Sequence, residues 1–279
     1  MSFFNYNSKL LAADTPVISV NNRGLRYGDG LFETMKWLNG KLIFANEHFA
    51  RLWKGMQLLQ FDIPKHFTPE KLQDEITALV KKNQHSRAAR VRLTVFRGGG
   101  GLYDAVSHQP NYSIETWVLQ DDVQSINSNG LVLGIYEDAT KNCDAFCNIK
   151  HNNYLPYAMA ALKAKKEKWN DALLLNNYGR ICEATIANIF MIKNETVFTP
   201  PLSEGAVAGI IRQQLLHWLK ATGYNCIQKE IAVEELHGAD EVFLTNAIYN
   251  LRWVQRINNK DYSNAMTQKI YTGFLPTIS

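Results

Sequence analysis

The chain has 279 residues, enough for one large domain or two moderate domains with their own hydrophobic cores. Hydrophobic residues make up 46% of it and charged residues 20%, and the formal net charge of +4 comes with no long Lys/Arg block, which argues against nucleic acid as a partner. No stretch approaches the ~20 apolar residues that a membrane-spanning helix needs, so we expect no membrane segment.

The first part of the chain predicts strands and two helices. The segment NGKLIFA reads as the end of a strand, and Asn46 is a candidate N-cap for a helix over Glu47–Gln60 with an apolar face. Thr68 and Pro69 are typical of the start of a second helix. Strands follow at ARVRLTVFR, whose apolar residues alternate, and at YSIETWVLQ.

A polar stretch without periodicity, DDVQSINSNG, predicts a domain boundary. We therefore expect an N-terminal α+β domain over residues 1–120, a linker over 121–130 and a C-terminal α+β domain over 131–279. The C-terminal domain would carry Lys150, a candidate functional residue.

Beyond the boundary, LVLGIYE reads as a strand and Tyr154–Trp169 as a helix. The region Ala172–Ile192 reads as two strands joined by a tight turn. A helix over Ala208–Thr222 is expected to stop at Gly223, a good C-terminal cap. The last elements expected are the strand EVFLTN and a helix over Ala265–Phe274.

Lys150 is the most informative residue because a glutamate, Glu183, stands about thirty positions after it in a suitable context. Pyridoxal phosphate chemistry needs an amine that forms a Schiff base with the cofactor aldehyde and later acts as a base, so its pKa must fall below the usual ~10.4. Lys150 stands in the mostly uncharged segment CNIKHNNYLPY, and Glu183 in the apolar segment ICEATIANIF. Alone, the first would be a solvated charge and the second a salt-bridged glutamate, and the motifs around them decide between these interpretations and a cofactor site.

Further segments occur in an order that resembles one family. NNRGLRYGDGLFETMKWLNGK and NEHFARLWKGMQLL precede the lysine, and GAVAGIIRQQLL and ADEVFLTNA follow the glutamate. With them, nearly the whole chain is similar to the class IV (fold type IV) pyridoxal-phosphate enzymes, which include branched-chain and D-amino-acid aminotransferases and aminodeoxychorismate lyase. The resemblance implies a two-domain α+β fold like that of D-amino-acid aminotransferase, pyridoxal 5'-phosphate as cofactor, and a homodimer.

The resemblance also implies roles for single residues. The family motif K-H-x-N or K-x-x-N-Y matches Lys150, His151, Asn153 and Tyr154. Lys150 would be the catalytic lysine that bonds to the cofactor, and Tyr154 would donate its hydroxyl to the ring oxygen. Glu183 would keep the pyridine nitrogen protonated, so that the ring withdraws electrons from the substrate α-carbon.

The cofactor phosphate has its own expected set of residues. Arg51 matches the arginine of the family motif E-H-x-x-R-L and would grip the phosphate with a two-donor fork. Ile210 and Ile211 would offer main-chain N–H groups at a helix start. Thr245 and Asn246, at the end of EVFLTNA, would complete the phosphate site.

The sequence indicates the substrate-binding residues less directly than the cofactor-binding residues. Phe32 falls where the family lines the substrate side, and Arg97 falls where several members carry an arginine, so it would bind a substrate carboxylate. The other interpretation of Arg97 is an arginine paired at a strand end. FRGGGGLY and LTNA look more like aminodeoxychorismate lyase, whereas FETMK looks more like the transaminases.

The first predicted function is transfer of an amino group between an amino acid and a 2-oxo acid. The alternative is 4-amino-4-deoxychorismate lyase, which forms 4-aminobenzoate and pyruvate, and a third reading is a carrier that holds pyridoxal phosphate without turnover. The donor, the acceptor and the choice between L- and D-substrates are left open.

The four cysteines indicate a reducing compartment. They form no CxxC pair and have no histidines at zinc-finger spacing, so we expect free thiols in a cytosolic protein and no metal site. The N-terminal segment MSFFNYNSKLLAADTP lacks a basic start followed by a long apolar run, and we expect no secretory signal.

Overall fold

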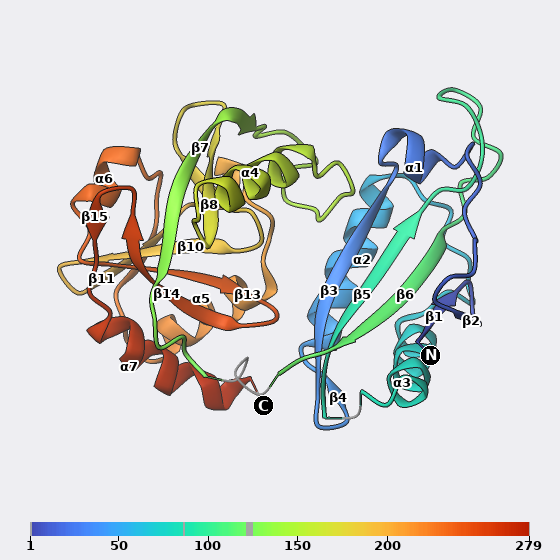
Figure 1. Cartoon of the computed structure of the whole chain (residues 1–279), viewed down its shortest axis with the longest axis horizontal. Helices are drawn as coiled ribbons and strands as arrows, with labels where there is room; N and C mark the ends of the chain where they lie inside the picture. The colour runs from blue at the N-terminus through green and yellow to red at the C-terminus, as the bar shows by residue number, and fades with distance from the viewer. Residues whose placement is uncertain (1, 86, 121–124, 279) are drawn as a thin grey trace. The chain divides into compact units, whose positions relative to one another are not determined.

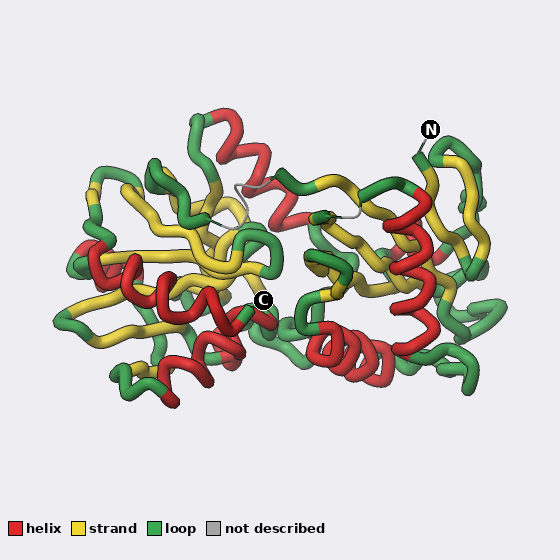
Figure 2. Tube along the Cα trace, turned by 90° about the horizontal axis from the view of Figure 1, so that it is seen from below, coloured by secondary structure: helices red, strands yellow, loops and turns green. Residues whose placement is uncertain are grey.

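The structure is a computed structural model that describes residues 2–85, 87–120 and 125–278. By their contacts the residues group into two units, one of Met1–Asp121 with Ile149–Asn153 and the other of Asp122–Asn148 with Tyr154–Ser279. In Figure 2 each unit is a layer of strands, drawn yellow, with helices, drawn red, packed along it. Among the described residues, no helix is both long and apolar enough to cross a membrane.

The first unit is a six-stranded sheet in the order β2-β1-β6-β5-β3-β4, with helices α2 and α3 packed on one face (Figure 1). All neighbouring strands described in it are antiparallel. Its strands are β1 (Phe3–Tyr6), β2 (Lys9–Ala12), β3 (Gly30–Leu38), β4 (Lys41–Leu42), β5 (Ala88–Phe96) and β6 (Asn111–Val118). Its helices are α1 (Arg23–Tyr27), α2 (Ala45–Leu58) and α3 (Pro69–Lys82).

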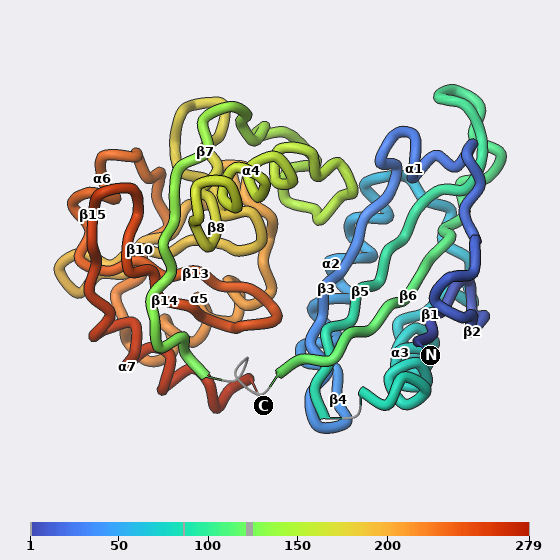
Figure 3. The backbone as a smooth tube through the Cα atoms, in the orientation of Figure 1, coloured from blue at the N-terminus to red at the C-terminus, as the bar shows by residue number. Residues whose placement is uncertain are grey.

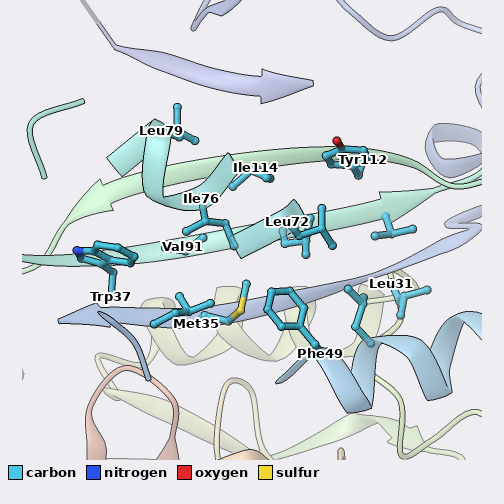
Figure 4. Close-up of a cluster of buried hydrophobic side chains, with 14 of the residues drawn as sticks. Leu31, Met35, Trp37, Phe49, Leu72, Ile76, Leu79, Val91, Tyr112 and Ile114 are labelled. Atoms are coloured by element: carbon cyan, nitrogen blue, oxygen red, sulfur yellow. The ribbon is translucent and has the colours of Figure 1, made fainter. Parts of the chain in front are cut away.

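The alternation predicted for β5 places one face of this sheet in the core. Val91, Leu93 and Val95 are fully buried, as expected for a half-buried strand. Leucine and isoleucine side chains of α3 and Phe49 of α2 pack over the same face (Figure 4). The opposite face of β3 and β5 is therefore available for polar and charged side chains.

The helix starts of this unit agree with the sequence in one case only. Thr68 caps α3 by accepting a hydrogen bond from the Lys71 N–H, as predicted. The prediction of Asn46 as the N-cap of α2 was wrong. The helix begins at Ala45 after Phe44, whose φ of 52° is left-handed, and no side chain caps it.

The second unit has a nine-stranded mixed sheet in the order β12-β11-β10-β13-β14-β7-β8-β9, with β15 paired to β14. Helix α4 packs against β7 and β8 (Figure 3). Its strands are β7 (Leu131–Lys141), β8 (Asp171–Asn176), β9 (Ile181–Ala184), β10 (Asn188–Lys193), β11 (Thr196–Thr199), β12 (Cys226–Gln228), β13 (Glu241–Asn246), β14 (Asn250–Ile257) and β15 (Lys260–Asp261). Its helices are α4 (Leu155–Lys166), α5 (Ile210–Ala221), α6 (Val233–His237) and α7 (Ala265–Phe274), with 3₁₀ turns at Leu202–Glu204 and Leu275–Thr277.

The region Ala172–Ile192 contains three strands, where the sequence predicted two. β9 and β10 are buried along almost their whole length, so the apolar run that begins at Ile181 continues into β10 without a marked polar break. The chain leaves β9 after Ala184 and enters β10 at Asn188, which separates what looked like one strand. Glu183 therefore lies near the end of a short strand.

The peptide Ile149–Asn153 groups with the first unit, whereas the sequence assigned Lys150 to the C-terminal domain. The main chain explains this placement, because the Phe32 N–H donates to the Lys150 carbonyl at 2.8 Å and the Asn152 N–H donates to the Gly30 carbonyl at 2.9 Å. The expected linker over 121–130 stays a prediction, and its residues 121–124 lie outside the described residues.

Candidate functional site

Glu183 lies on β9 with its carboxylate buried and held by several donors of the second unit. Its side chain accepts hydrogen bonds from the Tyr157 hydroxyl at 2.5 Å, from the Val207 N–H at 3.1 and 3.2 Å, and from Asn188 Nδ2 at 3.4 Å. The residue is 3% exposed. Donors arranged in this way favour the ionised carboxylate, which is the form that can hold a protonated pyridine nitrogen.

The hydroxyl of Tyr157, on α4, keeps its proton and therefore remains a hydrogen-bond donor to Glu183. Burial raises the pKa of its hydroxyl, and the negative charge of Glu183 raises it further. The Tyr157 ring stacks on the Tyr154 ring, with centroids 4.0 Å apart and an interplanar angle of 16°. The predicted cofactor residue Tyr154 is thus fixed beside the residue that orients Glu183, while its own contact with a cofactor stays a prediction.

The start of α5 offers donors for an anion. Gly209 is the N-cap, no side chain caps the helix, and Ile210 and Ile211 are its first residues, whose N–H groups have no intrahelical partner. A Cβ at Gly209 would lie 1.9 Å from Asn188 Oδ1, so this approach of the backbone requires glycine. The buried Thr245 Oγ1 has no hydrogen-bond partner among the described residues. Such an orphaned hydroxyl together with a helix start fits a phosphate.

Asn246, the last residue of β13, has a structural task. Its Oδ1 accepts hydrogen bonds from the Ile248 N–H at 3.0 Å and the Tyr249 N–H at 2.9 Å, which forms the turn into β14. Its predicted phosphate contact stays a prediction, and it would have to come from the side-chain Nδ2 or from the main chain.

Lys150 and Phe32 lie together in the first unit. The Lys150 Nζ is 4.7 Å from the centroid of the Phe32 ring, and the Arg92 guanidinium is 3.8 Å from the same centroid. Phe32 is 4% exposed. The aromatic ring is therefore contacted by two cations, and Arg92, which the sequence did not single out, joins the candidate site.

Arg51 is engaged in a buried cluster of the first unit. Its Nε donates to Glu33 Oε1 at 2.7 Å and its Nη2 to Glu33 Oε2 at 2.5 Å, while His48 Nδ1 lies 2.7 Å from Glu33 Oε2. This two-donor fork is the geometry predicted for a phosphate, here filled by a carboxylate. The phosphate role of Arg51 stays a prediction, and Glu33 is the residue that would orient the guanidinium.

The Glu33 cluster predicts a loss of stability in acid. Burial alone would raise the pKa of the Glu33 carboxyl, but the charge of Arg51 and the hydrogen bond with His48 outweigh it and lower the pKa from 4.5 to about 2. Because the folded pKa is depressed, the contribution is present above pH 4.5 and is lost as the pH falls toward 2. We expect Glu33→Gln to lower the free energy of unfolding by about 3 kcal/mol at neutral pH and by much less near pH 2.

Urea unfolding of both proteins over this pH range measures the difference. Glu230→Gln, at an exposed carboxylate, serves as the control and should change the unfolding free energy little at any pH. A difference between wild type and Glu33→Gln that does not shrink with falling pH would contradict the assignment.

Arg97 follows β5 and is buried in contacts of its own unit. Its Nη1 donates to Asp29 Oδ1 at 2.6 Å, its Nη2 donates to the carbonyls of Leu59 and Gln60, and its guanidinium lies 4.4 Å from the Phe61 ring centroid. This geometry matches the second interpretation, an arginine paired at a strand end. Its role toward a substrate carboxylate stays a prediction.

Several residues around Glu183 could not be assigned from the sequence. Asn188 stands in the family segment ICEATIANIF, so its presence there was a signal, but nothing in the segment revealed its contact with Glu183. Tyr157 has no signal beyond its position three residues after Tyr154. Lys141, whose Nζ lies 3.7 Å from Glu183 Oε1, comes from the end of β7 and would be found only from the fold.

Comparison with known proteins places this chain in one family. A family described as "Amino-transferase class IV" matches residues 30–257. An aminodeoxychorismate lyase of Vibrio harveyi is 28% identical over 86% of this chain and 88% of its own length, and a D-alanine aminotransferase of Bacillus licheniformis is 29% identical over 86% and 83%. The crystal structure of the branched-chain aminotransferase of Thermoproteus uzoniensis with norvaline superposes with a TM-score of 0.89 at 22% identity, covering 99% of this chain and 94% of that one.

The structural similarity confirms the predicted α+β fold of type IV, because it extends over almost the whole of both chains. The family match confirms that the chain is an enzyme and that its cofactor is pyridoxal 5'-phosphate. This chain belongs to the class IV aminotransferases.

Proposed function

We propose that this enzyme moves an amino group between an amino acid and a 2-oxo acid, with Lys150 as the catalytic lysine and Glu183 as the partner of the pyridine nitrogen. The observation that carries the proposal is the buried Glu183 carboxylate, fixed by Tyr157, Asn188 and the Val207 N–H. These donors keep the carboxylate ionised and hold it in one position. A fixed negative charge of this kind can stabilise a positive charge that is needed during a reaction.

When bound, pyridoxal phosphate supplies an aldehyde that condenses with amines and a ring that withdraws electrons. The Lys150 amine would hold the cofactor covalently and, once a substrate amine has replaced it, would carry a proton to and from the substrate α-carbon. Glu183 would hold the proton at the ring nitrogen. Thr245 and the main-chain N–H groups of Ile210 and Ile211 would bind the phosphate.

For the substrate carboxylate we propose Arg92 beside the predicted Arg97. The Arg92 guanidinium contacts Phe32, the same ring that the Lys150 Nζ contacts, and a carboxylate bound there would place an α-amine near the lysine side of the ring. Arg97 is buried and pairs with Asp29, so it would need to exchange that partner for a substrate.

A half-reaction tests the proposed transfer. With an amino acid alone, the holoenzyme should convert its yellow cofactor into pyridoxamine phosphate, and addition of a 2-oxo acid should restore the colour, because an aminotransferase must store the amino group between its two substrates. Absorption spectra recorded with a panel of L- and D-amino acids measure this and identify the donor. If no amino acid bleaches the cofactor and aminodeoxychorismate yields 4-aminobenzoate and pyruvate, the lyase is the correct function.

The same assay separates the two arginines. Arg92→Met should raise the amino-acid concentration for half-conversion about tenfold or more, since a hydrogen bond to a charged group contributes ~1.5–3 kcal/mol. Arg97→Met with a similar effect and unchanged thermal stability would support the predicted carboxylate role. Arg97→Met with lower thermal stability and an unchanged half-reaction would support its role as the partner of Asp29.

We also propose that the enzyme is a homodimer, as the family resemblance implies, and that it lies in the cytosol. The four cysteines, all of them free thiols, agree with a reducing compartment. Sedimentation analysis of the holoenzyme should give twice the mass of one chain.

A further inference from the structure

Lys141 is a buried cation next to Glu183 that the proposed function does not use. It is the last residue of β7 and 5% exposed, and its main-chain carbonyl accepts a hydrogen bond from the Asn177 N–H. Its Nζ lies 3.7 Å from Glu183 Oε1 and 4.8 Å from the centroid of the Tyr157 ring. An ammonium is rarely buried without a counter-charge, and Glu183 supplies the charge here.

The placement follows from the sheet. β7, β8 and β9 are neighbours, and Lys141 and Glu183 come from the two outer strands of this group. Tyr157 approaches from α4, which packs against β7 and β8. The three side chains therefore come from separate elements that the fold holds in fixed positions, and the ion pair does not depend on a flexible loop.

The charges of Lys141 and Glu183 would affect the protonation of a cofactor ring bound at Glu183. Without the ring, one carboxylate faces one ammonium, and the pair is neutral. A protonated ring nitrogen would bring a second cation to the same carboxylate, and two cations a few ångströms apart in a buried site repel each other. Lys141 thus favours the ionised form of Glu183 and opposes protonation of the ring nitrogen.

We infer that Lys141 is a positioning residue that acts through Glu183 and limits how strongly the pyridine nitrogen is protonated, so that the Lys141–Glu183 pair sets the electron withdrawal by the ring. The inference rests on the proposed role of Glu183 as the partner of the ring nitrogen. Removing the charge of Lys141 should therefore make the ring a stronger proton acceptor, whereas removing the charge of Glu183 should make it a weaker one.

Other titratable and charged groups face the pair from the surrounding elements. Burial raises the pKa of each neighbouring thiol and of the Tyr157 hydroxyl, so these groups are neutral at neutral pH. Arg212 is bonded to the Pro200 carbonyl and to Gln228, and its charge is common to wild type and every Lys141 variant. Among the described residues, the groups that surround the pair include Tyr154, Tyr157, Cys143, Cys147, Cys182 and Arg212.

The test measures the ring nitrogen itself. The holoenzyme is prepared with pyridoxal phosphate labelled with ¹⁵N in the ring, and the ¹⁵N chemical shift is followed against pH in wild type and in Lys141→Met. We expect the pKa of the ring nitrogen to be higher in Lys141→Met by about one unit or more, as a nearby like charge shifts a pKa by ~1–3 units. Lys141→Arg, which keeps the positive charge, should titrate like wild type.

A matched control and a second measurement accompany it. Lys163→Met removes a lysine of α4 that pairs with Glu167 at the exposed surface, and it should leave the ¹⁵N titration unchanged. Without cofactor, Lys141→Met leaves the buried Glu183 carboxylate without its ammonium partner. Addition of pyridoxal phosphate should therefore raise the melting temperature of Lys141→Met by more than it raises that of wild type.

The outcomes separate the inference from the proposed function. If Lys141→Met titrates like wild type while Glu183→Gln loses the ring proton, the inference about Lys141 is overturned and the role of Glu183 stands. If Glu183→Gln keeps the ring proton as well, the proposed role of Glu183 fails. Should Lys141→Met not fold, Lys141→Gln removes the charge with a polar side chain and gives the same comparison.

Discussion

Lys150→Ala should bind pyridoxal phosphate without a covalent bond and lose turnover, because only an ε-amine at this position can hold the cofactor as an imine and return a proton to the substrate. The main-chain bonds from Phe32 and Asn152 that fix the peptide do not involve the lysine side chain, so the variant should fold. Borohydride reduction of wild type, followed by peptide mass mapping, should place the pyridoxyl group on Lys150.

Two other lysines provide the controls for this assignment. Lys163 lies on the exposed side of α4, and Lys163→Ala should keep both the adduct and the turnover. Lys141 is buried near Glu183 and is the stronger competitor. A pyridoxyl group mapped to Lys141 would show that the catalytic lysine had been assigned wrongly.

Glu183→Gln should reduce the rate of α-proton removal by ~10²-fold or more while the cofactor stays bound, since loss of one preorganised electrostatic partner commonly costs this much. Glutamine keeps the shape of the side chain and can still accept hydrogen bonds from Tyr157 and the Val207 N–H, but it lacks the negative charge. Exchange of the α-hydrogen of an amino acid for deuterium measures this step separately from product release.

The control for the second prediction is a glutamate that has no part in the proposed site. Glu230 is exposed and pairs with Arg180, so Glu230→Gln should exchange the α-hydrogen at the wild-type rate. Near-normal exchange in Glu183→Gln would mean that another group protonates the ring.

Local sequence patterns correctly predicted those helices and strands that combine a clear apolar pattern with a definite boundary residue. The strand EVFLTN and the helix Ala265–Phe274 have the predicted bounds, and Thr68 caps α3 as its sequence indicates. Each of these segments combines a clear apolar pattern with a definite boundary residue. β14 was missed because NLRWVQRI mixes charged and apolar residues, and its strand character comes from pairing with β7 and β13.

The residues of the candidate site also differ in whether a local sequence pattern could predict them. Lys150 and Glu183 are predicted as site residues because they stand in motifs, whereas most of the residues that contact them come from other parts of the chain and could not be predicted. The Val207 N–H reaches Glu183 from 24 positions along the chain, and the Arg51 fork closes on Glu33. Sequence motifs thus predict which groups would carry the chemistry, while the charged partners around those groups follow only from the tertiary structure.

The pairing of β3 with the lysine peptide shows that two different residues serve Lys150: the lysine side chain supplies the amine, and Gly30 lets its main chain lie against β3. At Gly30, a Cβ would come within 2.3 Å of the Val95 carbonyl and 2.7 Å of Asn152 Nδ2, so the missing side chain lets β3 and the lysine peptide approach each other. The location of the amine therefore depends on Gly30, which lies 120 positions earlier in the sequence. A single methyl group added at Gly30 should therefore displace the lysine peptide, although the sequence would still contain every reactive side chain.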